Sequence, residues 1–196
     1  IIRVMRYNVG DSIICVHPEG KSATCQIEEI NETENYVLAK IVEWTEENVE
    51  LPISVTIVQS LVKGNKLDLI IQKGTELGAS QFILFQSERS VVKWDKKKIK
   101  NRLRRYEKIA KEASEQSGRT VVPKIQFVEQ VSTYLEEVKK VQSIKLIAYE
   151  EEAKGIQRAT FASKLQEAKI KNYNEIIVAI GPEGGFSEAE VATFKD

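Results

Sequence analysis

The spacing of apolar positions changes character near residue 50. Before that point, short runs rich in β-branched residues are separated by turn-forming residues, a pattern typical of strands with no long helix between them. The runs are Ser12–Val16, Ala23–Ile30 and Tyr36–Glu43. They predict a small barrel or sheet module over residues 1–50, with residues 51–196 as a second domain.

After residue 50, runs of strand character alternate with amphipathic helical segments. A helix is expected over Asn65–Leu77, because apolar residues recur there at helical spacing and Gly78 stands where a helix C-terminal glycine belongs. A longer helix is expected over about Asp95–Ser117. Such alternation predicts an α/β fold with a largely parallel sheet, in which ligands bind beyond the carboxyl ends of the strands. The remaining segments are Ile53–Ser60, Phe82–Gln86, Lys124–Val128, Val131–Val141, Ile144–Tyr149, Ala159–Ala168 and Glu175–Ile180.

A glycine-rich loop, Gly181–Pro182–Glu183–Gly184–Gly185–Phe186, follows the last predicted strand. Ser187 and Glu190 have the spacing of a capping box, and Phe186 and Val191 that of a hydrophobic staple, so a helix is expected to start at Ser187. The glycines allow the backbone to approach a ligand closely. The loop has neither the ending of a P-loop nor the dinucleotide-binding spacing. These residues alone leave a ligand-binding loop and a tight structural turn as equal alternatives.

Charge is balanced over the whole chain but not along it. The 29 basic and 29 acidic residues give a net charge of zero, so no overall field favours nucleic acid. From Lys93 to Lys108, however, nine of sixteen residues are Lys or Arg. Trp94 and Tyr106 within this run favour a nucleic-acid surface, and a solvated helix face is the alternative. If the surface binds RNA, its affinity should fall steeply with salt.

Cysteine and histidine usage argues against several kinds of site. Cys15 and Cys25 are expected to be reduced thiols of a cytosolic protein, with a disulfide as the alternative. His17, the only histidine, is interpreted as a turn residue, so neither a His-based triad nor a metal site is expected. No apolar stretch is long enough to span a bilayer and no leader is visible, which predicts a cytoplasmic protein without membrane association.

Five ordered motifs together resemble the RsmE family, the 16S ribosomal RNA methyltransferases that form N3-methyluridine. The resemblance implies a SPOUT-type α/β domain with a trefoil knot and a small N-terminal PUA-like β-barrel that binds RNA. It also implies S-adenosylmethionine as cofactor, a homodimer, and 16S ribosomal RNA of the small ribosomal subunit as partner. The motifs are Leu61–Lys66, Ile70–Gly78, Ser87–Val91, Glu112–Arg119 and Gly181–Phe186.

The resemblance also assigns residues to a site. Arg119 is the first candidate and Arg89 the second for stabilising charge on the uridine, since a guanidinium offers fixed paired hydrogen-bond donors. The alternative is that each arginine binds only the RNA backbone or a structural carboxylate. Glu115 and Glu183 are candidate general bases. The cofactor-binding candidates are Ile180, Gly181, Pro182, Glu183, Gly184, Gly185, Tyr149 and Glu150. The RNA-binding candidates are Lys63, Lys66, Arg89, Lys93 and Arg119.

The sequence departs from the family pattern at both ends. The strand that opens the family's barrel and the last motif, Leu-Gly-x-x-Ile-Leu-Arg-x-Glu-Thr-Ala, have no counterpart in it, so both domains are expected to be incomplete. Other functions stay open. They are a non-catalytic RNA-binding or ribosome assembly protein, a related knotted methyltransferase acting on transfer RNA or a ribose hydroxyl, and, more remotely, a nucleotide hydrolase.

Overall fold

The computed structural model describes residues 5–17, 19–45, 48–149 and 161–195. The chain forms two compact units, Ile1–Glu50 and Leu51–Asp196. Among the described residues, no helix has both the length and the apolar character that crossing a membrane requires.

The first unit is a three-stranded antiparallel sheet in the order β1–β2–β3. Its strands are β1 (Ser12–Val16), β2 (Ser22–Asn31) and β3 (Tyr36–Thr45), so all three predicted strands are confirmed. Ala23, Cys25 and Ile27 alternate along β2 and are buried, as expected for one face of a strand. Both cysteines are free thiols. The turn after β1 begins at His17, whose N–H donates to the Lys21 carbonyl at 2.7 Å, which agrees with its interpretation as a turn residue.

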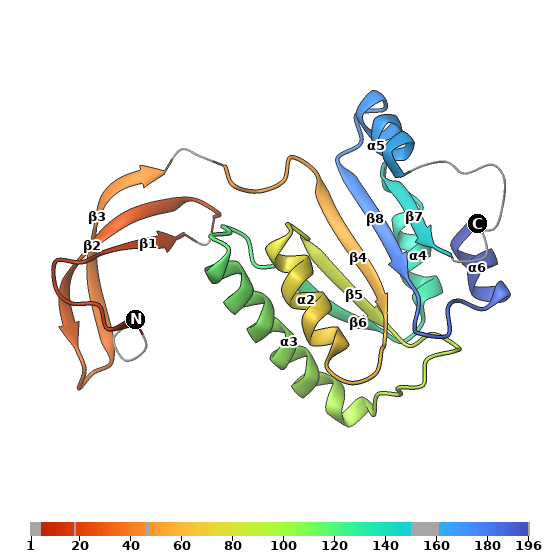
Figure 1. The fold of residues 1–196 in the computed structure, drawn as a ribbon, viewed down its shortest axis with the longest axis horizontal. Coiled ribbons are helices and arrows are strands. Elements are labelled where there is room, and N and C mark those ends of the chain that lie inside the picture. Colours follow the sequence, from red (N-terminus) through yellow and green to blue (C-terminus); the bar gives the residue numbers. More distant parts are fainter. Residues whose placement is uncertain (1–4, 18, 46–47, 150–160, 196) are drawn as a thin grey trace. The chain divides into compact units, whose positions relative to one another are not determined.

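The second unit is a five-stranded parallel sheet in the order β6–β5–β4–β8–β7, which confirms the predicted α/β fold (Figure 1). The strands are β4 (Ser54–Ser60), β5 (Gln81–Phe85), β6 (Lys124–Val128), β7 (Ile144–Ala148) and β8 (Glu175–Ile180). The helices are α2 (Lys66–Glu76), α3 (Lys96–Gln116), α4 (Val131–Val138), α5 (Phe161–Ile170) and α6 (Glu188–Lys195).

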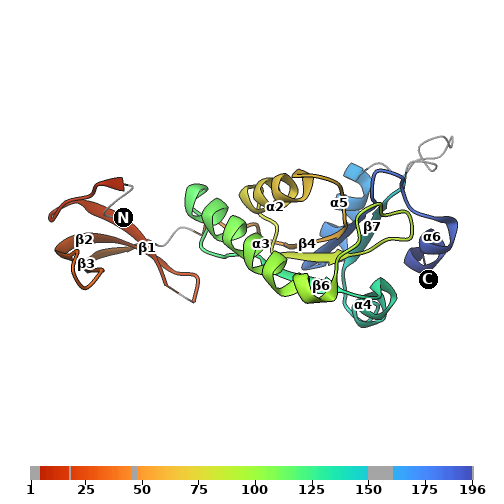
Figure 2. The ribbon, with the colours of Figure 1, turned by 90° about the horizontal axis from the view of Figure 1, so that it is seen from below.

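A hydrophobic cluster lies on each face of this sheet. Successive β4 residues show the two faces: Ile57 packs with α2 and α3, whereas Val58 packs with α4 and α6. Figures 1 and 2 show α2 and α3 side by side. Helix α2 lies close to the sheet because it carries Gly74, where an added Cβ would be only 2.8 Å from Phe82 Cζ.

The helix ends follow local rules closely. Helix α2 ends at Glu76 with Leu77 as its C-cap, and Gly78 then adopts a left-handed φ of 102°, as the sequence predicts. Helix α3 begins after Asp95, whose carboxylate accepts the Lys97 N–H at 3.0 Å. The helix predicted over Val131–Val141 is shorter than expected, because the chain tightens after Val138 into a turn in which the Val141 N–H donates to the Val138 carbonyl.

Candidate functional site

A pocket lies at the carboxyl edge of the parallel sheet, where the glycine loop after β8 meets the loop after β5. Parallel strands present their carboxyl ends at one edge, so loops distant in sequence converge there. The pocket has a volume of about 410 Å³, within the roughly 300–1,000 Å³ usual for small-molecule sites. Its lining residues are Arg89, Ala148, Tyr149, Ile180, Gly181, Pro182, Glu183, Gly184, Gly185, Phe186 and Glu188.

The glycine loop is a tight turn that needs glycine at Gly181 and Gly185 for different reasons. Gly185 has a φ of +68°, a conformation that other residues adopt only with strain. A Cβ on Gly181 would lie 3.3 Å from Gly185 C and from the Phe186 backbone N, closer than most real Cβ contacts. The wall of the pocket along this loop is therefore mainly backbone.

The predicted capping box at the start of α6 is present. The Ser187 N–H donates to Glu190 Oε2 at 2.9 Å, and the Glu190 N–H donates to Ser187 Oγ at 3.2 Å. Phe186 and Val191 are both buried in the same cluster, as expected for the predicted staple. The cap fixes the direction in which the loop enters the helix.

Glu190 also binds the loop that follows β5. Ser87 Oγ donates to Glu190 Oε2 at 3.0 Å, and the Glu88 N–H donates to Glu190 Oε1 at 2.9 Å. One carboxylate thus holds α6 and residues 87–88 together, although they are about a hundred positions apart. The sequence showed Glu190 only as a helix cap, because nothing local to residue 190 indicates partners in the loop that follows β5.

The same loop brings Arg89 to the pocket wall. Arg89 Nη1 donates to the Gly184 carbonyl at 3.2 Å. The following residue anchors the loop to β4, because Ser90 Oγ lies 2.8 Å from Ser60 Oγ and donates to the Leu61 carbonyl at 3.3 Å. Arg89 therefore lies beside the predicted cofactor-binding residues of the glycine loop.

Glu183 is held by the loop that follows β4. Lys66 Nζ lies 2.8 Å from Glu183 Oε1, and the Lys63 N–H donates to the same oxygen at 3.2 Å. The hydrogen bond from Lys66, followed by backbone N–H donors, lowers the pKa of Glu183 to about 2. A carboxylate with so low a pKa is a weak proton acceptor at neutral pH, so the geometry gives no support to Glu183 as general base.

Arg119 lies at the opposite edge of the sheet. It follows α3 and precedes β6, and its Nη1 donates to the backbone carbonyls of Thr75 at 3.0 Å and Ala79 at 2.7 Å. The side chain is only 8% exposed. These bonds join the end of α2 to the start of β5, so the placement supports a structural role and separates Arg119 from the pocket. Glu115, near the same end of α3, pairs with Lys111 at 3.8 Å.

The aromatic residues of the basic segment are core residues. Trp94 and Tyr106 are 8% and 6% exposed, and their rings stack with centroids 5.8 Å apart. Neither ring is therefore exposed to stack on bases, so the nucleic-acid interpretation of this segment gains no support from its aromatic residues. Lys93 and most of the other cations remain exposed.

Two of the predicted cofactor-binding residues, Tyr149 and Glu150, follow β7 in the sequence. Tyr149 lines the pocket just beyond the end of β7. Glu150 lies outside the described residues. Among the residues that the structure does describe, no group of three or more His, Cys, Asp or Glu side chains is placed to hold a metal ion.

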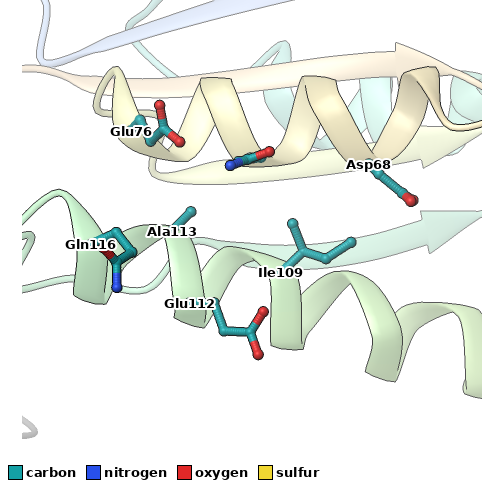
Figure 3. Close-up of a pocket in the computed structure, with 7 residues that line it drawn as sticks. Asp68, Glu76, Ile109, Glu112, Ala113 and Gln116 are labelled. Atoms are coloured by element: carbon teal, nitrogen blue, oxygen red, sulfur yellow. The ribbon is translucent and has the colours of Figure 1, made fainter. Parts of the chain in front are cut away.

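A second pocket, of about 410 Å³, lies between α2 and α3 (Figure 3). Its three acidic side chains have basic partners: Asp68 pairs with Arg105, Lys73 Nζ lies 2.7 Å from Glu76, and Lys108 Nζ lies 3.6 Å from Glu112. Its remaining lining is Gln72, Ile109, Ala113 and Gln116. We interpret it as a groove between neighbouring helices.

Comparison with known proteins identifies the family. A model of an RNA methyltransferase domain matches residues 49–196, and a model of an RNA methyltransferase PUA domain matches residues 1–42. The ribosomal RNA small subunit methyltransferase E of Bacillus subtilis is 44% identical over 191 residues, which cover 97% of this chain and 73% of that protein. The chain belongs to the ribosomal RNA small subunit methyltransferase E family.

Other methyltransferase E proteins agree with this assignment. The Synechocystis protein is 28% identical over 97% of this chain and 58% of its own length. A crystal structure of the Neisseria gonorrhoeae methyltransferase E, bound to S-adenosyl methionine, superposes with a TM-score of 0.76 at 28% identity, covering 99% of this chain and 75% of that one.

Proposed function

We propose that this chain methylates N3 of a uridine in 16S ribosomal RNA of the small ribosomal subunit, with S-adenosylmethionine as methyl donor. The observation that carries the proposal is the backbone-lined pocket at Gly181–Gly185 in a member of the methyltransferase E family. A relative of the same fold was crystallised with S-adenosyl methionine bound.

The pocket has the mixture of polar backbone and apolar side chains that a nucleoside-containing cofactor requires. Backbone amides and carbonyls of the glycine loop recognise the polar edges of a nucleoside, and Ile180 and Tyr149 offer apolar surface beside them. By resemblance, Glu150 would take part as well. The bound donor supplies an electrophilic methyl group on a sulfonium.

Among the chain's own residues, Arg89 is the best-placed candidate for stabilising the reacting uridine. Removing the N3 proton places negative charge on the base, and a guanidinium beside the pocket stabilises it. Arg89 lines the pocket and contacts Gly184. We assign Arg119 a structural role instead, because it is buried against backbone carbonyls at the other edge.

The proposal includes the partners expected from the family. The substrate is ribosomal RNA, bound by the N-terminal module and by exposed cations that include Lys63 and Lys93. Lys66 is a weaker candidate for binding RNA, because its ammonium group already pairs with Glu183. We further propose a homodimer in the cytoplasm, where ribosomal subunits are assembled.

Two glycine variants test the pocket. Gly185 and Gly118 have the same φ of +68° and an added Cβ on either would meet nothing within 4 Å, but only Gly185 lines the pocket. Gly185→Ala and Gly118→Ala should therefore lose similar stability, about 1–2 kcal/mol. Calorimetric titration with S-adenosylmethionine should show weaker binding for Gly185→Ala alone. Equal affinity in both variants would exclude this loop as the cofactor site.

The enzyme and the non-catalytic alternative differ in a direct assay. Incubation with small ribosomal subunits and labelled S-adenosylmethionine, followed by nucleoside analysis of the RNA, should give N3-methyluridine. Methyl transfer to a ribose or to transfer RNA would instead identify a related knotted methyltransferase. Cofactor binding without any transfer would favour an assembly protein that has kept the fold.

A further inference from the structure

The cations of α3 are divided unevenly along the helix. Residues 96–105 contain seven Lys or Arg and no acidic residue, whereas residues 106–116 contain two Lys and three Glu. In the second half, Lys108 and Lys111 each have a glutamate four positions later, at 3.6 and 3.8 Å. In the first half no such pairing within the helix exists. The charge of α3 is thus concentrated in its first three turns.

Three of the seven cations in the first half have partners elsewhere in the protein. Lys96 pairs with Glu129 at 2.7 Å, Arg105 pairs with Asp68, and Arg102 lies over the Trp94 ring, 5.1 Å from its centroid. The remaining four are exposed, as is Lys93 just before the helix, and within the described part of the chain none of the five forms a salt bridge. We call these five residues the basic strip: Lys93, Lys97, Lys98, Lys100 and Arg104.

The basic strip opposes the stability of its own helix. The first turn of a helix carries a partial positive charge, so lysines there are unfavourable and acids favourable. Asp95 caps α3, but the first turn after this cap has no acidic residue, whereas those of α2 and α6 do. Lys97 and Lys100 also repel at a spacing of three, and Lys100 and Arg104 at a spacing of four. Folding alone therefore does not explain the composition of this segment.

The basic strip starts at the edge of the sheet where the pocket lies. The chain leaves β5 at its carboxyl end, passes Arg89 at the pocket wall, and reaches Lys93 before α3 begins. Helix α3 then runs back toward the other edge, and Figure 1 shows its start at the same end as the arrowheads of β4 and β8. A polyanion lying on the strip would approach the pocket along residues 89–93.

We propose that the basic strip binds the phosphate backbone of the substrate RNA next to the target uridine. This inference rests on the proposed function, which supplies the RNA. Five exposed cations that form no salt bridge with the described residues match a chain that carries one charge per nucleotide, and lysine is suited to phosphate as a point charge. The buried Trp94 and Tyr106 are unavailable for stacking, so the strip binds phosphates and does not read bases.

A pair of variants within one helix tests the proposal. Lys97→Gln/Lys100→Gln removes two charges of the basic strip, and Lys108→Gln/Lys111→Gln removes two charges paired with glutamates. Affinity for a fluorescent 16S ribosomal RNA fragment is measured over a range of salt concentrations. Each phosphate contact contributes about 0.7–0.9 to the slope of log K against log salt, so the first variant should lose about 1.4–1.8 and the second close to nothing.

Thermal stability gives an independent readout with the opposite sign. Because the strip repels the start of its helix, Lys97→Gln/Lys100→Gln should raise Tm by roughly 1–3 °C while it weakens RNA binding. Lys108→Gln/Lys111→Gln should leave Tm unchanged or lower it slightly. A fall in Tm for the first variant would make the lysines structural and overturn the proposal.

The remaining outcomes are also decisive. Equal salt slopes in the two variants would place the RNA elsewhere. If Lys97→Gln/Lys100→Gln lost binding to polyglutamate but bound the RNA fragment as tightly as the unaltered protein does, the partner of the strip would be an acidic protein. Calorimetry with S-adenosylmethionine on both variants separates this inference from the proposed function, because the cofactor pocket contains none of the four lysines and its affinity should stay unchanged.

Discussion

Replacing Glu190 by alanine perturbs two features of the second unit at once. The carboxylate caps α6 through the Ser187 N–H, and it accepts hydrogen bonds from Ser87 Oγ and from the Glu88 N–H. Ser87 is 2% exposed and Ser187 is 8% exposed, so neither can fully replace the lost acceptor by water. The change therefore leaves buried donors without a partner.

The expected loss of stability follows from the three hydrogen bonds that the Glu190 carboxylate accepts. A hydrogen bond to a charged group contributes about 1.5–3 kcal/mol, and Glu190 is half-buried, so we take roughly 1 kcal/mol for each of the three bonds. Glu190→Ala should then cost about 3 kcal/mol. Ser187→Ala removes only the hydroxyl that accepts the Glu190 N–H, and a lost cap of this kind costs about 1 kcal/mol.

Urea unfolding monitored by tryptophan fluorescence measures the difference. Trp44 belongs to the first unit and Trp94 to the second, so a Trp44→Phe background reports on the second unit alone. If Glu190→Ala costs no more than Ser187→Ala, the carboxylate is only a helix cap and the proposed tie between the two loops is wrong. Ser87→Ala should show strong coupling with Glu190→Ala in a double-mutant cycle.

Three further perturbations have defined outcomes. Because the pKa of Glu183 is lowered, its contact with Lys66 stabilises the loop above pH 4.5 and is lost as the pH falls toward 2. A carboxyl NMR titration should show this low pKa, and Lys66→Met should bring it back toward 4.5. Arg119→Met should lower stability by about 2–3 kcal/mol in urea unfolding and leave cofactor affinity unchanged, since its hydrogen bonds hold the other edge of the sheet. Gly74→Ala should cost about 1–3 kcal/mol in the same assay despite alanine's better helix propensity, because its Cβ would meet Phe82 at 2.8 Å.

The features predictable from the sequence were those set by neighbouring residues. Apolar periodicity located the strands and helices, because one face of each is buried. The Asp95, Gly78 and Ser187 positions marked helix ends, because caps depend on residues within one turn. The position of the glycine loop at a carboxyl end followed from the alternation of strands and helices alone.

Features that depend on distant residues could not be predicted in this way. The basic segment contains nine cations and two aromatic residues, and only packing shows that Trp94 is buried under Arg102. Arg119 ends a motif just before β6, but no residue near it in the sequence shows that its side chain binds the Thr75 and Ala79 carbonyls. Glu190 gave a local signal that was correct but incomplete, because Ser87 and Glu88 reach it from another part of the chain.

The hydrogen bonds around the glycine loop join residues that are 95, 102, 103, 117 and 120 positions apart. Contacts of such long range are slow to form, because the entropy of closing a long loop is lost before the contacts are gained. During synthesis, the pocket can form only after Glu190 has left the ribosome. A cofactor bound there stabilises the completed sheet as a whole by mass action and cannot stabilise a shorter nascent chain. Cofactor concentration would thus change the stability of the completed fold and not the rate of the early folding steps.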